Sequence, residues 1–258
     1  MKIAIVGCGN MGGSIALSLA ENNQYEVYVI NRNPEKALKL RDENNNINIL
    51  EKLIDAKNFD VVIIAVKPQQ LPPLYDELKA LDAKLYISIA AGVNIKTLEE
   101  KLGSHSVARF MPNIAAKCKS SVTAVALGDG VENRTLPLSI AASFGSAFIL
   151  PESQFPAFIG ISGSAIAYVF EFIHYLALGG VKEGIPYKES AEIAKDTLIS
   201  ASRLMESTSK GAIELETMVC SAGGTTIEGV KALQDGSFGS AVMNAVVKAA
   251  ERNKELEK

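Results

Sequence analysis

The sequence predicts an α/β domain over residues 1–152, followed by an all-helical domain over residues 153–258. Three observations support this division. A G-x-G-x-x-G motif follows the first apolar run, strand-like and helix-like segments then alternate, and only helical periodicity continues after about residue 152. A chain of 258 residues is long enough for one large or two modest domains with cores of their own.

The first element is a short apolar strand, Lys2–Val6, of the kind found buried in parallel sheets. A glycine motif follows at once, and we expect a helix over residues 12–22. Glycines permit a tight turn, and the helix N-terminus attracts a pyrophosphate, so this order indicates a Rossmann-type dinucleotide-binding domain. The expected cofactor contacts from this segment are Val6, Gly7, Cys8, Gly9, Asn10, Met11 and Gly12.

The second strand, residues 26–30, bears on the choice of cofactor. It ends at Asn31, Arg32 and Asn33, where an NAD enzyme would usually carry an acid for the ribose 2′-hydroxyl. Arg32 can instead hold a 2′-phosphate through its planar guanidinium, although it could also be a solvated surface charge. We therefore expect Asn31 and Arg32 to contact the cofactor, and NADP is favoured while NAD stays possible.

The rest of the first domain continues the alternation and predicts a mostly parallel sheet with helices on both faces. Strands are expected at residues 61–66, 85–89, 106–110, 122–127 and 146–150, and helices at 34–43, 70–80, 94–102 and 132–143. Ligands bind beyond the carboxyl ends of such strands. The further expected cofactor contacts are Ala65, Val66, Lys67, Pro68, Ala90, Ala91 and Asn113.

The second domain carries helical patterns only. Residues 165–183 are apolar almost all round, so this helix needs cover on most faces, and a second copy of the chain is a natural partner. Residues 189–206 form an amphipathic pattern, and a further helix begins at Phe238 and runs into a charged tail.

A glycine loop near the C-terminus predicts a second anion site. Thr225 followed by Glu228 forms a capping box, which predicts that a helix starts at this point. Free amides and the positive end of the helix dipole favour a carboxylate there. The expected substrate contacts are Ser221, Gly223, Gly224, Thr225 and Thr226. One loop for a cofactor and one for a carboxylate together suggest hydride transfer to a small carboxylic acid.

Composition excludes several other classes. The net charge of −3 lacks the basic footprint of a nucleic-acid binder. The three cysteines have no metal-type spacing and suggest reduced thiols in the cytoplasm, so neither a metal nor a disulfide framework is expected. We expect no membrane segment, because the nearest candidate, residues 165–181, is short and carries Glu171 and His174.

Six blocks in order along nearly the whole chain resemble the Δ1-pyrroline-5-carboxylate reductase family. These blocks are Gly7-Cys8-Gly9-Asn10-Met11-Gly12, Ala65-Val66-Lys67-Pro68, Ala90-Ala91-Gly92, Met111-Pro112-Asn113, Ser162-Gly163-Ser164 and Gly223-Gly224-Thr225-Thr226-Ile227. The resemblance implies hydride transfer from NAD(P)H to the ring C=N carbon, which gives proline. It also implies dimers, often assembled into larger rings, through the helical domain. Thr226 matches a threonine near the ring nitrogen and is the catalytic candidate.

Four places depart from the family pattern and leave alternatives open. Ala165 and Ile166 replace Gly-Pro, Ile114 and Ala115 replace Thr-Pro, Ala222 replaces a common proline, and Ser209 stands near a glutamate of some members. The alternatives are a reductase of another cyclic imine or a β-hydroxyacid, and a non-catalytic NADPH-binding regulator.

The remaining candidates have weaker support from the sequence. His105 and His174 are the two histidines, and neither is assigned a catalytic role because neither lies in one of these blocks. Arg109 could hold a substrate carboxylate or form a structural ion pair.

Overall fold

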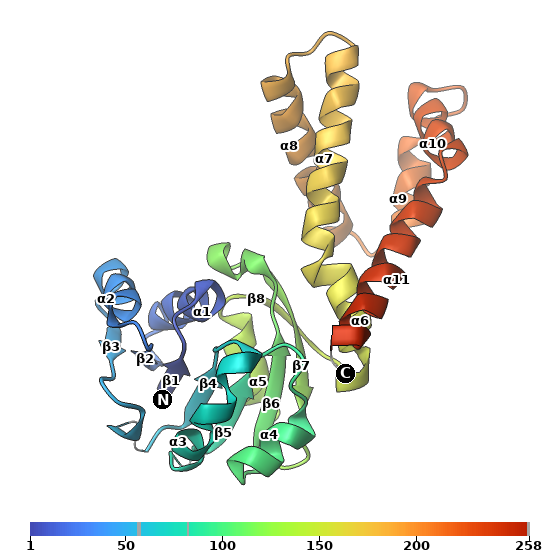
Figure 1. Ribbon diagram of the computed structural model, residues 1–258. Coiled ribbons are helices and arrows are strands. Elements are labelled where there is room, and N and C mark those ends of the chain that lie inside the picture. Colours follow the sequence, from blue (N-terminus) through green and yellow to red (C-terminus); the bar gives the residue numbers. More distant parts are fainter. Residues whose placement is uncertain (56–57, 82, 257–258) are drawn as a thin grey trace. The chain divides into compact units, whose positions relative to one another are not determined.

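The computed structural model describes residues 1–55, 58–81 and 83–256 (Figure 1). These residues divide into two units. The N-terminal unit comprises Met1–Gly163 together with the end of the chain from Ala249, and the helical unit comprises Ser164–Lys248. The N-terminal unit thus extends past the predicted boundary at residue 152, through the turn at Ile159–Gly163.

An eight-stranded sheet forms the centre of the N-terminal unit, with the strand order β3-β2-β1-β4-β5-β6-β7-β8. All neighbouring strands are parallel except β6 and β7, which are antiparallel. The bounds are β1 Lys2–Val6, β2 Glu26–Ile30, β3 Ile47–Ile49, β4 Val61–Ile64, β5 Leu85–Ser88, β6 Val107–Met111, β7 Ser121–Leu127 and β8 Gly145–Ile149. The short strand β3 was not predicted.

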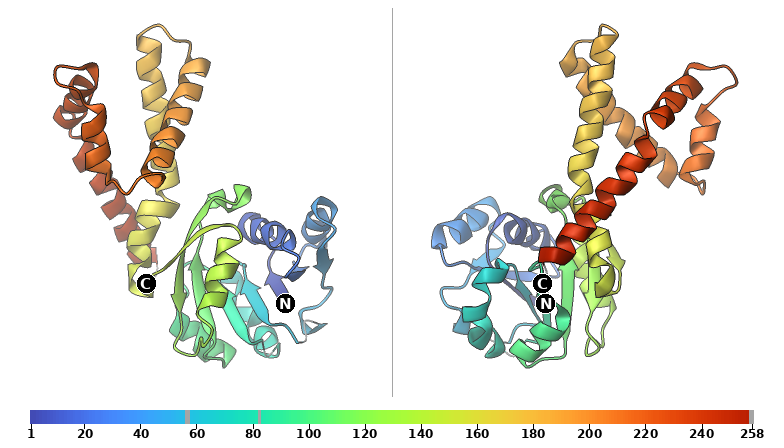
Figure 2. Two further views of the ribbon diagram at one scale, coloured as in Figure 1. Left: turned by 180° about the vertical axis from the view of Figure 1, so that it is seen from behind. Right: turned by 45° about the vertical axis from the view of Figure 1, so that its right-hand side comes forward.

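Helices cover both faces of this sheet (Figures 1 and 2). Because successive strand residues point to opposite faces, Ile3 and Ile5 of β1 belong to the core on the face that α1 and α5 cover, whereas Ala4 and Val6 belong to the core on the face that α3 and α4 cover. The bounds are α1 Asn10–Ala20, α2 Pro34–Glu43, α3 Tyr75–Lys79, α4 Ile95–Leu102, α5 Thr135–Ala142 and α6 Phe155–Phe158.

The helix predicted over residues 70–80 is largely wrong. The segment holds two short 3₁₀ turns, Pro68–Gln70 and Pro72–Leu74, before α3 begins at Tyr75. Proline lacks an amide hydrogen and clashes with the preceding turn, so Pro72 and Pro73 prevent a continuous α-helix.

The helical unit contains α7 Ala165–Lys182, α8 Tyr187–Glu206, α9 Ala212–Val219 and α10 Thr225–Asp235, and most of α11 Phe238–Leu256. Helices α7 and α8 pack side by side through small residues, and the arm formed by α9, α10 and α11 diverges from this pair (Figures 1 and 2). At the α7–α8 crossing, the Ser190 hydroxyl donates to the Ala177 carbonyl at 2.8 Å.

One helical run in the described part of the chain, Glu152–Lys182, is long and apolar enough to cross a membrane by length and composition alone. Residues 165–181 alone were expected to be too short to span a membrane. The run is longer because the helical turns that precede α7 continue directly into it. A single helix of this kind is weak evidence for a membrane. Of its apolar window, 22% is buried within the chain.

Candidate functional site

The loop between β1 and α1 depends on glycine for its shape. Gly7 has φ = +109°, and a Cβ added there would lie 2.7 Å from the Ala65 carbonyl oxygen. A Cβ at Gly12 would lie 2.1 Å from the Gly7 carbonyl oxygen. Helix α1 has Gly9 as its N-cap, with no side-chain hydrogen bond to the first turn. The loop therefore leaves backbone amides at a helix N-terminus, which suits a pyrophosphate.

Cys8 lies in this loop, but its side chain points into the core and is 7% exposed. Its amide donates to Asn31 Oδ1 at 2.9 Å, and its thiol contacts the Ile30 carbonyl. Burial raises the pKa of the Cys8 thiol from 9.0 to about 11, against a smaller lowering by the positive charge of Lys36. We therefore expect a protonated thiol of low reactivity at neutral pH, and contact between Cys8 and a cofactor stays a prediction.

The turn after β2 is held by asparagine side chains. Asn33 caps α2, since its Oδ1 accepts the Glu35 amide at 3.0 Å, and Asn31 Nδ2 donates to the Asn33 carbonyl at 2.9 Å. Arg32 lies between them, exposed and without an ion-pair partner within the described residues. Its guanidinium is thus free to bind an anion.

The sheet register places the predicted cofactor segments at one edge. Val6 pairs with Ile30 on one side and with Ile64 on the other, and Ile64 pairs with Ser88. The residues that follow these strand ends therefore lie together beyond the same edge of the sheet. They include the glycine loop, Asn31, Arg32, Ala65, Val66, Lys67, Pro68, Ala90 and Ala91.

Asn113 is placed differently from the other predicted cofactor residues. Its side chain is 3% exposed, its Nδ2 donates to the Ser162 hydroxyl at 3.1 Å, and its Oδ1 accepts the Ala115 amide. The Ser162 hydroxyl in turn donates to the Val122 carbonyl. The Asn113 side chain therefore ties two turns together, and a cofactor contact there stays a prediction.

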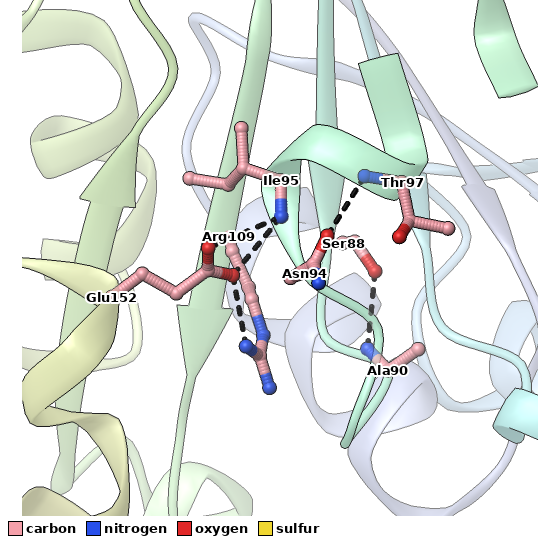
Figure 3. A network of polar contacts seen from close by, with 7 residues as sticks. All are labelled: Ser88, Ala90, Asn94, Ile95, Thr97, Arg109 and Glu152. Carbon is pink, nitrogen blue, oxygen red and sulfur yellow. Dashed lines mark hydrogen bonds and ion pairs between the residues drawn. The ribbon is translucent and has the colours of Figure 1, made fainter. Parts of the chain in front are cut away.

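Arg109 forms a structural ion pair (Figure 3). Its guanidinium is 2.8 Å from Glu152 Oε1 and lies 5.0 Å from the centroid of the Phe155 ring. Glu152 also accepts the Ile95 amide at 3.0 Å, at the start of α4. Because Arg109 is 2% exposed, this arrangement supports the structural alternative over a substrate carboxylate. Sequence analysis missed Glu152, and no local pattern relates two residues 43 positions apart.

The C-terminal glycine loop leads directly into α10. Gly223 has φ = +68°, and the Gly224 amide donates to the Ser221 carbonyl at 3.0 Å. A Cβ at Gly224 would lie 2.2 Å from Ser221 Oγ, so glycine at this position leaves room for the Ser221 hydroxyl.

The predicted capping box at Thr225 is wrong. The N-cap of α10 is Gly224, in an extended conformation, and Thr225 is the first helical residue. No side chain caps the first turn, so its amides stay available to an anion. The hydroxyls of Thr225 and Thr226 have no hydrogen-bond partner among the residues that the structure describes. With Gly224 as the N-cap, this helix end therefore has more free donors than a threonine cap would leave.

No group of three or more His, Cys, Asp or Glu side chains that could hold a metal ion occurs in the described ranges. The histidines also lie outside the two loops. His174 Nδ1 contacts the Tyr187 hydroxyl at 3.0 Å on the exposed α7–α8 pair.

Two family models match the chain. Residues 152–256 match the pyrroline-5-carboxylate reductase dimerisation family, and residues 2–92 match the family described as NADP oxidoreductase coenzyme F420-dependent. A pyrroline-5-carboxylate reductase of Methanosarcina acetivorans is 34% identical over 100% of this chain and 98% of its own length. The chain belongs to the pyrroline-5-carboxylate reductase family.

Solved structures agree with this assignment. A pyrroline-5-carboxylate reductase of Coxiella burnetii has a TM-score of 0.93 and 29% identity, with 99% of this chain and 98% of that chain covered. The Plasmodium falciparum pyrroline carboxylate reductase with NADP bound has a TM-score of 0.84 and 27% identity, over 100% and 98% of the two chains. Family membership confirms the predicted fold class and makes the chain an oxidoreductase.

Proposed function

We propose that this chain reduces Δ1-pyrroline-5-carboxylate to L-proline with NADPH, as the last step of proline biosynthesis in the cytoplasm. NADH stays a possible second donor. The observation that carries the proposal is a pair of uncapped helix N-termini, one on α1 and one on α10, each preceded by a glycine-shaped loop. Within this family, the first suits a dinucleotide pyrophosphate and the second suits a carboxylate.

The residues around the first loop fit a dinucleotide. Gly7 and Gly12 occupy positions where a side chain would clash with the backbone, so the chain passes close enough for the amides to reach phosphate oxygens. Arg32 would hold the 2′-phosphate, and Lys67, exposed at the end of β4, would add positive charge. The cofactor would supply the hydride.

The second loop would bind the substrate. The amides of Gly223 and Thr225 and the Ser221 hydroxyl would hold the carboxylate, and Gly224, whose own amide donates to the Ser221 carbonyl, would leave room for that hydroxyl. The Thr226 hydroxyl would orient the ring nitrogen. A protonated C=N group is already a good hydride acceptor, so the site must supply orientation more than acid–base chemistry. This requirement agrees with a site built from amides and hydroxyls and without histidine.

The helical unit would assemble homodimers or larger homo-oligomers. Its buried side chains are Ala177, Ser190, Ala194 and Leu215, whereas Phe170 and Met243 are 65% and 64% exposed. An apolar cleft of about 740 Å³ lies between α7, α10 and α11. A second copy of this unit offers the same apolar surface and would cover the exposed side chains and the cleft, as the dimerisation family of residues 152–256 implies.

The direct test is oxidation of NADPH at 340 nm by the purified chain with Δ1-pyrroline-5-carboxylate, with NADH in parallel. Substrate-dependent turnover, faster with NADPH, is the expected result. Cofactor binding without turnover would contradict the proposal. That result would favour a substrate that is another cyclic imine, which a panel of imines would test, or a non-catalytic NADPH-binding regulator. The departures from the family pattern at Ile114, Ala165 and Ile166 would then be the first places to look for the cause.

A further inference from the structure

We propose that Asn31 is a positioning residue that ties the glycine loop to the β2–α2 turn, so that the two segments hold the dinucleotide as one rigid unit. The proposal rests on the cofactor site of the proposed function. It adds that the Asn31 side chain acts mainly through the backbone on either side of it, and that an uncharged amide is needed there.

The first half of the tie is to the glycine loop. The Gly7 amide donates to the Ile30 carbonyl at 2.8 Å, as the last backbone bond between the ends of β1 and β2. The next amide, that of Cys8, donates to Asn31 Oδ1 at 2.9 Å. The Asn31 side chain thus takes the place of a main-chain carbonyl and carries the strand pairing one residue further, into the loop that would meet the pyrophosphate.

The second half of the tie is to the turn that carries Arg32. Asn31 Nδ2 donates to the Asn33 carbonyl at 2.9 Å, and Asn33 itself caps α2. Both polar atoms of the one amide are therefore engaged, one on each loop. Arg32 lies between Asn31 and Asn33, so the same bonds fix the backbone from which its guanidinium would reach a 2′-phosphate.

Only a side chain with both an acceptor and a donor can make these two bonds. A carboxylate in place of the amide could still accept from the Cys8 amide, but it could not donate to the Asn33 carbonyl. It would also place a negative charge at the strand end where NAD-binding domains hold the ribose 2′-hydroxyl, so it would repel a 2′-phosphate. An apolar side chain would lose both bonds. The two substitutions therefore separate the positioning effect from the charge effect.

The experiment compares Asn31→Leu and Asn31→Asp in the full chain. Dissociation constants for NADPH and NADH are measured by nicotinamide fluorescence, together with KM and kcat for each cofactor. Asn133→Leu is the matched control, because Asn133 Oδ1 also accepts backbone amides, those of Thr135 and Leu136, but at the start of α5. Thermal unfolding of the three variants without cofactor reports any general loss of stability.

Asn31→Leu is expected to weaken both cofactors about tenfold, as an increase in KM with kcat little changed at saturating cofactor. Asn31→Asp is expected to weaken NADPH at least about tenfold while NADH stays within about threefold of the wild type. Asn133→Leu is expected to change neither cofactor affinity.

Unchanged affinities for both cofactors in Asn31→Leu would overturn the inference, as would equal losses of NADPH and NADH in Asn31→Asp. If Asn31→Leu does not fold, Asn31→Ala, which also loses both bonds, is measured in its place with the same expected and overturning results. Wild-type protein that binds neither cofactor would instead overturn the proposed function and this inference with it. If the wild type turns over substrate and Asn31→Leu keeps its affinity for both cofactors, the inference about Asn31 is overturned while the proposed function stands.

Discussion

Strand β4 and helix α7 are both strongly apolar, but they differ in how much of their surface the chain buries. All four residues of β4 are buried between the two helical layers of the N-terminal unit. Helix α7 spans 18 residues, and among them Ala177 alone is buried. The N-terminal unit thus completes its own core, whereas the helical unit exposes the residues from which a core would be made.

This difference shows which part of the protein depends on assembly. Side chains such as Phe170 and Tyr175, 65% and 61% exposed, cost free energy in water unless another surface covers them. We therefore expect the helical unit to depend on a second copy for stability, and we expect the N-terminal unit to be stable without one. Substitutions in the two regions should accordingly fail in different ways.

The largest expected effect comes from a charge on the exposed apolar surface of α7. Phe170→Glu should weaken assembly by more than about 100-fold, because a two-fold interface would bury two uncompensated carboxylates. Light scattering coupled to size-exclusion chromatography measures the mass. Leu38→Glu, at a 40% exposed leucine of α2, is the matched control and should leave the mass unchanged. An oligomer that survives Phe170→Glu would contradict the comparison.

A core substitution in the N-terminal unit should lower the free energy of unfolding by an amount that does not depend on assembly. Phe110 is 1% exposed within the sheet, and Phe110→Ala should lower the free energy of unfolding by about 3–5 kcal/mol. Urea unfolding followed by circular dichroism should show the same loss at every protein concentration. A loss that varied with concentration would mean that this unit also depends on a partner.

Substitutions in the helical unit should change the rate of the chemical step, whereas substitutions in the N-terminal unit should change cofactor affinity. Thr226→Ala in the helical unit should lower kcat roughly 10-fold to 100-fold and leave the NADPH dissociation constant unchanged, because the hydroxyl would act on the substrate only. Steady-state rates and fluorescence titration measure the two quantities. Thr217→Ala, which removes a hydroxyl bonded to the Ile213 carbonyl within α9, is the control. Full turnover of Thr226→Ala would remove Thr226 from the mechanism.

Arg32→Ala is the corresponding test in the N-terminal unit. It should weaken NADPH about tenfold or more and NADH much less, since only NADPH carries the 2′-phosphate. Arg41→Ala, in the last turn of α2, removes an equal charge from the other end of that helix. Equal losses of both cofactors in Arg32→Ala would show that the arginine does not recognise the 2′-phosphate.

The smallest expected effect concerns the buried thiol of the glycine loop. Burial raises the pKa of Cys8 to about 11, so alkylation at pH 8 should modify the exposed Cys118 first and Cys8 only slowly. A raised native pKa stabilises the fold below pH 9.0, and that contribution is lost as the pH rises from 9.0 to about 11. Peptide mapping by mass spectrometry and urea unfolding at pH 8 and 10.5 measure both. Equal alkylation of Cys8 and Cys118 in the native protein would contradict this account.

The predictable parts of the fold are those set by local pattern. The apolar run Lys2–Val6 and the glycines after it predicted β1, the loop and α1, because strand alternation and glycine turns depend on adjacent residues. The interruption at Pro72 and Pro73 could also have been foreseen from the loss of two amide hydrogens. The wrong cap at Thr225 arose because Gly224, which carries no capping side chain, adopts the extended N-cap conformation instead.

The other features depend on contacts that no local pattern encodes. The Arg109–Glu152 ion pair and the Asn113–Ser162 hydrogen bond join residues far apart in sequence. The bond between the Cys8 amide and Asn31 Oδ1 belongs to the same class, since it joins residues 23 positions apart, whereas the bond from Asn31 Nδ2 to the Asn33 carbonyl is local.

Sedimentation velocity from micromolar to nanomolar concentration, with helicity and NADPH-dependent turnover measured at the same dilutions, tests whether the helical unit depends on assembly and the N-terminal unit does not. We expect an oligomer that loses helical signal and turnover together as it dissociates, while the sheet of the N-terminal unit stays folded. A single chain that keeps full helicity and full turnover at every dilution would contradict this expectation.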